Sequence, residues 1–137
     1  MVEAKGYKFK VLNIIIGVEL NDAERFFADK LRFETDPATV NHMVENKDQD
    51  IVIVDVRGRN AYKEGHVPTS ISMPNEELDA RINELPKNKR IILYCYNIAC
   101  FRAPRAALKL AQHGYDNVTE MVGGFDEWQK HGHPVEK

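Results

Sequence analysis

The sequence has few cysteines, no surplus of basic residues and no long hydrophobic run. Its two cysteines among 137 residues are too few for the disulfide framework of a small secreted protein, so we expect a reducing, cytoplasmic location. Its 19 basic and 21 acidic residues give a net charge of −2, and no basic patch indicates a nucleic-acid partner. The longest near-apolar stretch, residues 11–20, is too short and too interrupted to cross a membrane. These features favour a soluble protein that binds neither nucleic acid nor membrane.

What the sequence does contain is an alternation of strand-like and helix-like segments. The apolar runs at 51–55 and 91–95 are typical of strands buried on both faces. Shorter candidate strands are 32–35, 71–73 and 118–122, and candidate helices are 23–33, 37–46, 59–64, 76–85, 104–113 and 125–131. Strands that alternate with helices pair in parallel, so the sequence predicts an α/β fold with helices on both faces of the sheet.

Cys95 ends the apolar run at 91–95 and precedes a predicted helix that begins at Pro104. Proline suits the first helical position, where its missing N–H would have no partner, so residues 96–103 are predicted to form a loop. Backbone N–H groups of such a loop, together with the start of the helix, favour a thiolate over a thiol. Asp55 ends the other buried strand, and both residues should lie at the same edge of the sheet, where ligands collect.

Four short motifs in this order resemble the signatures of the rhodanese domain family. They are DVR at 55–57, GHVP at 65–68, LYC at 93–95 and GGFDEW at 123–128. The resemblance implies a single rhodanese-like domain with a five-stranded parallel sheet, over residues 21–137 with a core at about 33–135. Residues 1–20 would form an amino-terminal arm, for which no structure is predicted.

The resemblance also implies a function, which the chemistry of a loop cysteine supports. Cys95 would accept sulfane sulfur as a persulfide from a small anionic donor such as thiosulfate, and pass it to a thiol, to a cyanide-like acceptor or to a protein acceptor. This reaction needs neither a metal nor an organic cofactor. The substrate-binding loop would consist of Tyr96, Asn97, Ile98, Ala99, Phe101 and Arg102. Arg102 could contact the anion, and Tyr96 and Phe101 could line the pocket mouth.

The loop departs from the common rhodanese pattern, which has a central glycine and an arginine five positions after the cysteine. Here Cys100 holds that fifth position and Arg102 follows two residues later, so the loop is most similar to a bacterial subgroup with two loop cysteines. Cys100 is interpreted either as a resolving thiol, which would attack a persulfide or sulfenate on Cys95, or as a small apolar loop residue.

Three further residues have a supporting role in this interpretation. Asp55 and Arg57 are expected to tie loops together at the rim, with Glu64 as a candidate partner for Arg57 because Ala61 replaces a glutamate that is frequent in the family. His66 is expected to make fold-holding hydrogen bonds, with a proton shuttle as the alternative.

Three other functions remain open. A partner-binding module without catalysis and a thiol redox protein that uses Cys95 and Cys100 are both compatible with the sequence. A Cys-based phosphatase or arsenate reductase is disfavoured, because six residues rather than five separate Cys95 from Arg102.

Overall fold

The structure of the protein is a computed structural model that describes residues 19–137. The predicted arm at residues 1–20 therefore lies almost wholly outside the described residues. The chain divides into two compact units, with the boundary between Arg32 and Phe33. Within residues 19–137, no helix combines the length and the apolar character needed to cross a membrane.

Nearly all of helix α2 (Asp22–Phe33) belongs to the first unit. The side chain of Asn21 accepts a hydrogen bond of 2.9 Å from the main-chain N–H of Glu24, and the Glu24 carboxylate accepts one of 3.1 Å from the N–H of Asn21. This reciprocal pair satisfies N–H groups that have no partner inside the helix. It confirms the helix start that the sequence predicts at Asn21 and Asp22.

The second unit is a parallel α/β fold, as predicted from the alternating segments. Its strands are β1 (Glu34–Thr35), β2 (Ile51–Asp55), β3 (Ile71–Ser72), β4 (Arg90–Tyr94) and β5 (Val118–Met121). Its helices are α3 (Pro37–Glu45), α4 (Arg59–Glu64), α5 (Asn75–Arg81), the 3-10 helix η1 (Ile82–Glu84), α6 (Arg102–Gln112) and α7 (Gly124–Lys130). The strands form one sheet in the order β1-β5-β4-β2-β3, and every pairing is parallel.

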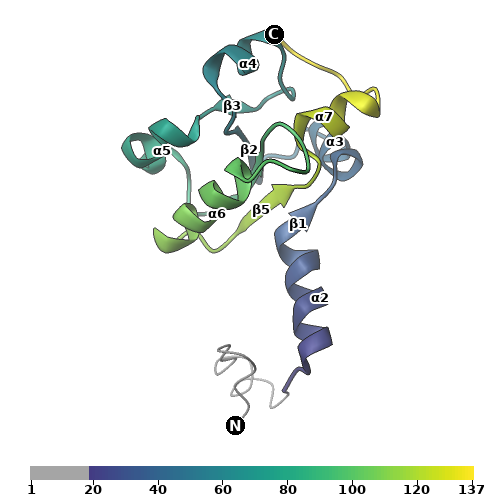
Figure 1. Ribbon diagram of the computed structural model, residues 1–137, viewed down its shortest axis with the longest axis vertical. Coiled ribbons are helices and arrows are strands. Elements are labelled where there is room, and N and C mark those ends of the chain that lie inside the picture. Colours follow the sequence, from purple (N-terminus) through teal and green to yellow (C-terminus); the bar gives the residue numbers. More distant parts are fainter. Residues whose placement is uncertain (1–18) are drawn as a thin grey trace. The chain divides into compact units, whose positions relative to one another are not determined.

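Apolar side chains alternate between the two faces of this sheet, which is why both central strands are apolar throughout. On one face, β2 and β4 pack with α5, η1 and α6 through residues such as Val54, Leu93 and Leu110. On the other face, they pack with α3 and α7 through residues such as Ile92 and Trp128. Figure 1 shows these two groups of helices on opposite sides of the strands. The sheet register pairs Asp55 with Tyr94, so both central strands end at the same edge.

Two helix starts test the predicted role of proline. Helix α3 begins as predicted, with Pro37 at its first position and with the Asp36 side chain accepting a bond of 2.8 Å from the N–H of Thr39. The predicted start of α6 at Pro104 is wrong, because the helix begins at Arg102. Pro104 is the third residue of the helix, still within the first turn where its N–H would have no partner. The loop between β4 and α6 therefore spans residues 95–101 and not the predicted 96–103.

Candidate active site

Cys95 directly follows β4 and is almost fully buried, with 2% of its surface exposed. It belongs to the apolar cluster beneath α5 and α6, together with Val56 and Ala103. A thiol in this position is held rigidly at the carboxyl edge of the sheet.

The loop turns back on itself so that Cys100 lies beside Cys95. The side-chain oxygen of Asn97 accepts a hydrogen bond of 2.9 Å from the N–H of Ala99, and the main-chain oxygen of Asn97 accepts one of 3.1 Å from the N–H of Cys100. These are the bonds of a local turn that an asparagine side chain stabilises. As a result, Sγ of Cys95 donates a hydrogen bond of 3.6 Å to the carbonyl oxygen of Cys100.

The start of α7 fixes the first two residues of the loop. The N–H of Phe125 donates to the carbonyl of Cys95 and the N–H of Asp126 donates to the carbonyl of Tyr96, each at 2.9 Å. This approach requires Gly124, since a Cβ atom there would lie 2.5 Å from the carbonyl oxygen of Cys95. Gly124 lies in the GGFDEW motif, but its contact with the cysteine loop was not predicted. The Gly123-Gly124 pair was the only sequence signal for such a close approach.

Of the two thiols, Cys100 is the one that ionises more readily. Burial raises the pKa of the Cys95 thiol to about 12, and the hydrogen bond to Cys100 adds to this rise. The N–H groups of Ala103 and Tyr96 act in the opposite direction but do not offset it. Burial also opposes ionisation of Cys100, but hydrogen bonds from the Cys95 thiol and from backbone N–H groups outweigh it and lower the pKa of Cys100. One of these donors, the N–H of Arg102, lies 3.4 Å from Sγ of Cys100. The prediction of a thiolate on Cys95 is therefore wrong for the free pair.

Asp55 is the centre of a buried polar network at the same edge of the sheet. Its carboxylate accepts bonds of 3.1 and 2.7 Å from Nε and a terminal nitrogen of Arg57, and one of 2.6 Å from the hydroxyl of Tyr94. The hydroxyl of Tyr94 in turn accepts a bond of 3.1 Å from the N–H of Val67. Burial opposes the charge of Arg57, but the bonds and the charge of Asp55 outweigh it and raise the pKa of Arg57. The network joins the ends of β2 and β4 to the GHVP turn.

Arg57 pairs with Asp55 and not with Glu64, so the suggested substitute partner is wrong. A terminal nitrogen of Arg57 also donates to the carbonyl of Gly65 at 2.6 Å. Its guanidinium lies 4.2 Å from the ring centre of Phe125, on α7. Arg57 thus connects the region after β2 with the helix that holds the cysteine loop.

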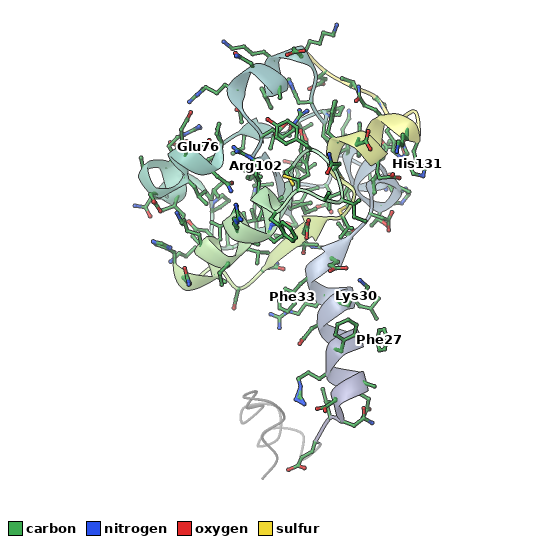
Figure 2. The ribbon with its side chains drawn as sticks, in the orientation of Figure 1. Phe27, Lys30, Phe33, Glu76, Arg102 and His131 are labelled. Carbon is green, nitrogen blue, oxygen red and sulfur yellow. The ribbon has the colours of Figure 1, made fainter. Side chains whose placement is uncertain are left out.

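Arg102 lies beside the thiols, but its guanidinium group already has partners. Nε donates to the carbonyl of Val56 at 2.8 Å, and a terminal nitrogen pairs with the Glu76 carboxylate at 2.9 Å. Figure 2 shows Arg102 and Glu76 side by side, from α6 and α5. The hydrogen bond from Arg102 is the main cause that lowers the pKa of Glu76, so this carboxylate is ionised at neutral pH. Sequence reasoning did not identify Glu76, whose position within a polar helix gives no distinguishing signal.

The remaining loop and supporting residues have clear positions. Tyr96 is partly exposed, and its hydroxyl accepts a bond of 3.2 Å from the N–H of Gly58. Ile98 and Phe101 are exposed at 78% and 66%, so both loop residues present apolar side chains to solvent. His66 stacks on the ring of Tyr62, and its Nδ1 lies 2.7 Å from the Tyr62 carbonyl. His66 therefore packs against the end of α4. None of its hydrogen bonds within residues 19–137 involves Cys95 or Cys100.

An open groove lies beside the tip of the loop. Its lining includes Ile98, Val122 and Glu127, together with residues at the start of α3. His131, which directly follows α7 and is labelled in Figure 2, also lines it. Neither cysteine lines this groove. Among residues 19–137, no group of three or more His, Cys, Asp or Glu side chains is arranged to hold a metal ion.

Comparison with known proteins identifies the same fold. A family model described as the rhodanese-like domain matches residues 36–131. A solved structure of the BH2092 protein from Bacillus halodurans is 42% identical, covers 85% of each chain and superposes with a TM-score of 0.78. The full-length protein from Lactobacillus plantarum is 27% identical, covers 86% of this chain and 99% of its own, and has a TM-score of 0.75.

Curated relatives have two kinds of name. A sulfurtransferase of Allochromatium vinosum is 31% identical over 64% of this chain and 79% of its own length. The thiosulfate sulfurtransferase GlpE of Coxiella burnetii is 32% identical over 65% of this chain and 80% of its own. The HTH-type transcriptional regulator Rv0324 of Mycobacterium tuberculosis is 29% identical over 94% of this chain, which spans only 57% of the regulator's length.

Proposed function

The chain belongs to the rhodanese-like domain family, and we propose from this premise that it is a sulfurtransferase that carries sulfane sulfur as a persulfide on Cys95. The observation that carries the proposal is the position of Cys95. It follows the central strand β4 at the carboxyl edge of the sheet, inside a loop whose N–H groups approach both thiols. The sulfurtransferase names of two relatives support the same reaction.

The first half-reaction uses both thiols. The Cys100 thiolate accepts the proton of the Cys95 thiol, to which it is hydrogen-bonded, and so generates a nucleophile at Cys95. Sγ of Cys95 then attacks the outer sulfur of a donor such as thiosulfate. The sulfur–sulfur bond of the donor breaks, sulfite leaves with the electron pair, and a persulfide remains on Cys95.

In the second half-reaction, a thiol or a cyanide-like acceptor attacks the terminal sulfur of the persulfide. Cys95 leaves as a thiolate, so the cycle consumes one donor and one acceptor and leaves the enzyme unchanged. The exposed apolar side chains of Ile98 and Phe101 suit an acceptor thiol on a protein surface, because exposed apolar side chains gain from burial against a partner.

A donor and acceptor assay tests this proposal. Sulfite release from thiosulfate in the presence of cyanide is expected for the wild-type protein and should be lost in Cys95→Ser. Ala111 on α6 offers a matched control, because it is exposed and Ala111→Ser introduces a hydroxyl without removing a thiol. Sulfite release that persists in Cys95→Ser would refute the proposed role of Cys95.

A further inference from the structure

Cys100 is placed to do more than accept a proton. It is less buried than Cys95, and the turn at Asn97 brings it back to the end of β4. The two thiols interact directly, and Sγ of Cys95 lies 3.6 Å from the Cys100 carbonyl oxygen. A persulfide on Cys95 would therefore form within reach of a second sulfur nucleophile.

We propose that Cys100 resolves the Cys95 persulfide, so that the protein releases hydrosulfide and forms a disulfide between Cys95 and Cys100. This inference rests on the proposed function, because it needs the persulfide as its substrate. It adds a second activity, the reduction of sulfane sulfur, to transfer of that sulfur to an acceptor.

The step balances in atoms, protons and electrons. Cys100 returns the proton that it took from Cys95 to the terminal sulfur of the persulfide, and becomes a thiolate again. Its Sγ then attacks Sγ of Cys95, the bond between Sγ and the terminal sulfur breaks, and hydrosulfide leaves with the electron pair. The sulfane sulfur gains two electrons, and the two cysteine sulfurs lose one each.

Three features of the site favour this step over a persulfide that waits for an external acceptor. The N–H of Arg102, 3.4 Å from Sγ of Cys100, stabilises the attacking thiolate, and hydrogen bonds lower its pKa. The guanidinium of Arg102 is bound to the carbonyl of Val56 and to Glu76, and these bonds anchor the residue whose main-chain N–H faces the Cys100 sulfur. Only four residues separate the cysteines, so the attack closes a small ring within one loop.

The disulfide must be reduced before the next turnover, and the proposal assigns this to a dithiol of the thioredoxin or dithiothreitol class. Exchange begins at Cys100, the more exposed of the two sulfurs. The net reaction consumes sulfane sulfur and a dithiol, and yields hydrosulfide and the oxidised dithiol. Without a dithiol, each chain completes the reaction once.

Anaerobic intact mass spectrometry combined with a hydrosulfide assay tests the inference. Reduced, desalted wild-type protein exposed to thiosulfate should lose about 2 Da and release one hydrosulfide per chain, with further release only after dithiothreitol is added. Ala111→Ser, an exposed change on α6 outside the cysteine loop, should behave as the wild type does. Cys100→Ser and Cys100→Ala lack the proton acceptor and should form the persulfide more slowly, but after prolonged exposure they should gain about 32 Da and release no hydrosulfide.

The outcomes separate this inference from the proposed function. A wild-type protein that keeps the gain of about 32 Da and releases no hydrosulfide would overturn the role of Cys100 and leave the persulfide on Cys95 intact. If neither the wild type nor either Cys100 variant gains sulfur or releases hydrosulfide, even after prolonged exposure, while circular dichroism shows all three folded, the proposed function itself fails. Cys100→Ser and Cys100→Ala differ in polarity, so a result that both share does not come from how one particular side chain packs.

Discussion

The sulfur atom of Cys95 lies 3.6 Å from the carbonyl oxygen of Cys100 and donates a hydrogen bond to it. The buried thiol therefore has its partner within its own loop. Burial of Cys95 and its interaction with the Cys100 side chain make Cys100 the thiol that ionises first. This interaction also makes the chemistry of one cysteine depend on the other.

The pH dependence of alkylation should reveal this coupling. Iodoacetamide should modify Cys100 with a midpoint below that of an ordinary thiol, and Cys95 should stay unmodified between about pH 7 and 9, because its pKa is raised to about 12. Peptide mapping at each pH measures both sites. In Cys95→Ala, the midpoint of Cys100 should rise, since the thiolate loses a hydrogen-bond donor. A midpoint for Cys95 below that of Cys100 would contradict the assignment.

Release of Arg102 from Glu76 should improve the binding of an anionic donor. In Glu76→Gln the carboxylate no longer neutralises the guanidinium, so the KM for thiosulfate should fall about two- to fivefold, with a stronger dependence on salt. Glu77→Gln is the matched control, because Glu77 lies on the same helix but pairs with Arg59 and Arg81. An equal change in the two variants, or none in Glu76→Gln, would refute the explanation.

The same release should occur in the wild-type protein as the pH falls. Arg102 holds the pKa of Glu76 below its usual range, so the pair persists at neutral pH and is lost as the pH falls through that lowered pKa. Loss of the pair leaves the guanidinium free for the anion. The KM for thiosulfate should therefore fall at acid pH in the wild type but not in Glu76→Gln.

Gly124 should be required for the position of the cysteine loop. A Cβ atom there would lie 2.5 Å from the carbonyl oxygen of Cys95, whereas one at Gly132 would meet nothing within 4 Å. Both glycines have a positive φ, so Gly132→Ala measures the backbone strain alone, about 1–2 kcal/mol. Gly124→Ala should cost more in urea unfolding and should also reduce sulfur transfer. Equal losses of stability with full activity in both variants would contradict the role given to Gly124.

Asp55 should be essential for stability because its removal leaves a buried cation. Asp55 is fully buried and Arg57 is 4% exposed, so Asp55→Ala should lower the free energy of unfolding by about 3–5 kcal/mol. Asp79 forms a surface pair with Lys109 at 3.1 Å, and Asp79→Ala should cost about 1 kcal/mol or less. Similar losses of unfolding free energy in the two variants, measured by urea unfolding, would show that the buried pair contributes no more to stability than the surface pair.

The sheet could be predicted from sequence because its signal is local. Continuous apolar runs at Ile51–Asp55 and at 91–95 specify strands that are covered on both faces, and the intervening helical patterns then require parallel pairing. The position of Cys95 at the edge of the sheet follows from the same pattern. These inferences need no knowledge of how distant side chains meet.

The chemistry of the loop could not be predicted in the same way, because it depends on contacts between distant segments. The pairing of Arg102 with Glu76 joins α6 to α5, and the close approach of Gly124 joins α7 to the cysteine loop. Neither contact has a periodic signal in the sequence. The higher pKa of Cys95 arises from burial, which a strand pattern indicates but does not quantify. The wrong helix start at Pro104 has a simpler cause, since proline is tolerated throughout the first turn.

The central claim is that sulfur is carried on Cys95, and locating the transferred atom tests it most directly. The variants Cys100→Ser and Cys95→Ser each keep one of the two cysteines. Both variants should be treated with thiosulfate and analysed by peptide mass spectrometry. The account predicts a gain of about 32 Da on the Cys95 peptide of Cys100→Ser and no gain in Cys95→Ser. Sulfur found on Cys100 in Cys95→Ser, with none on Cys95 in Cys100→Ser, would contradict it.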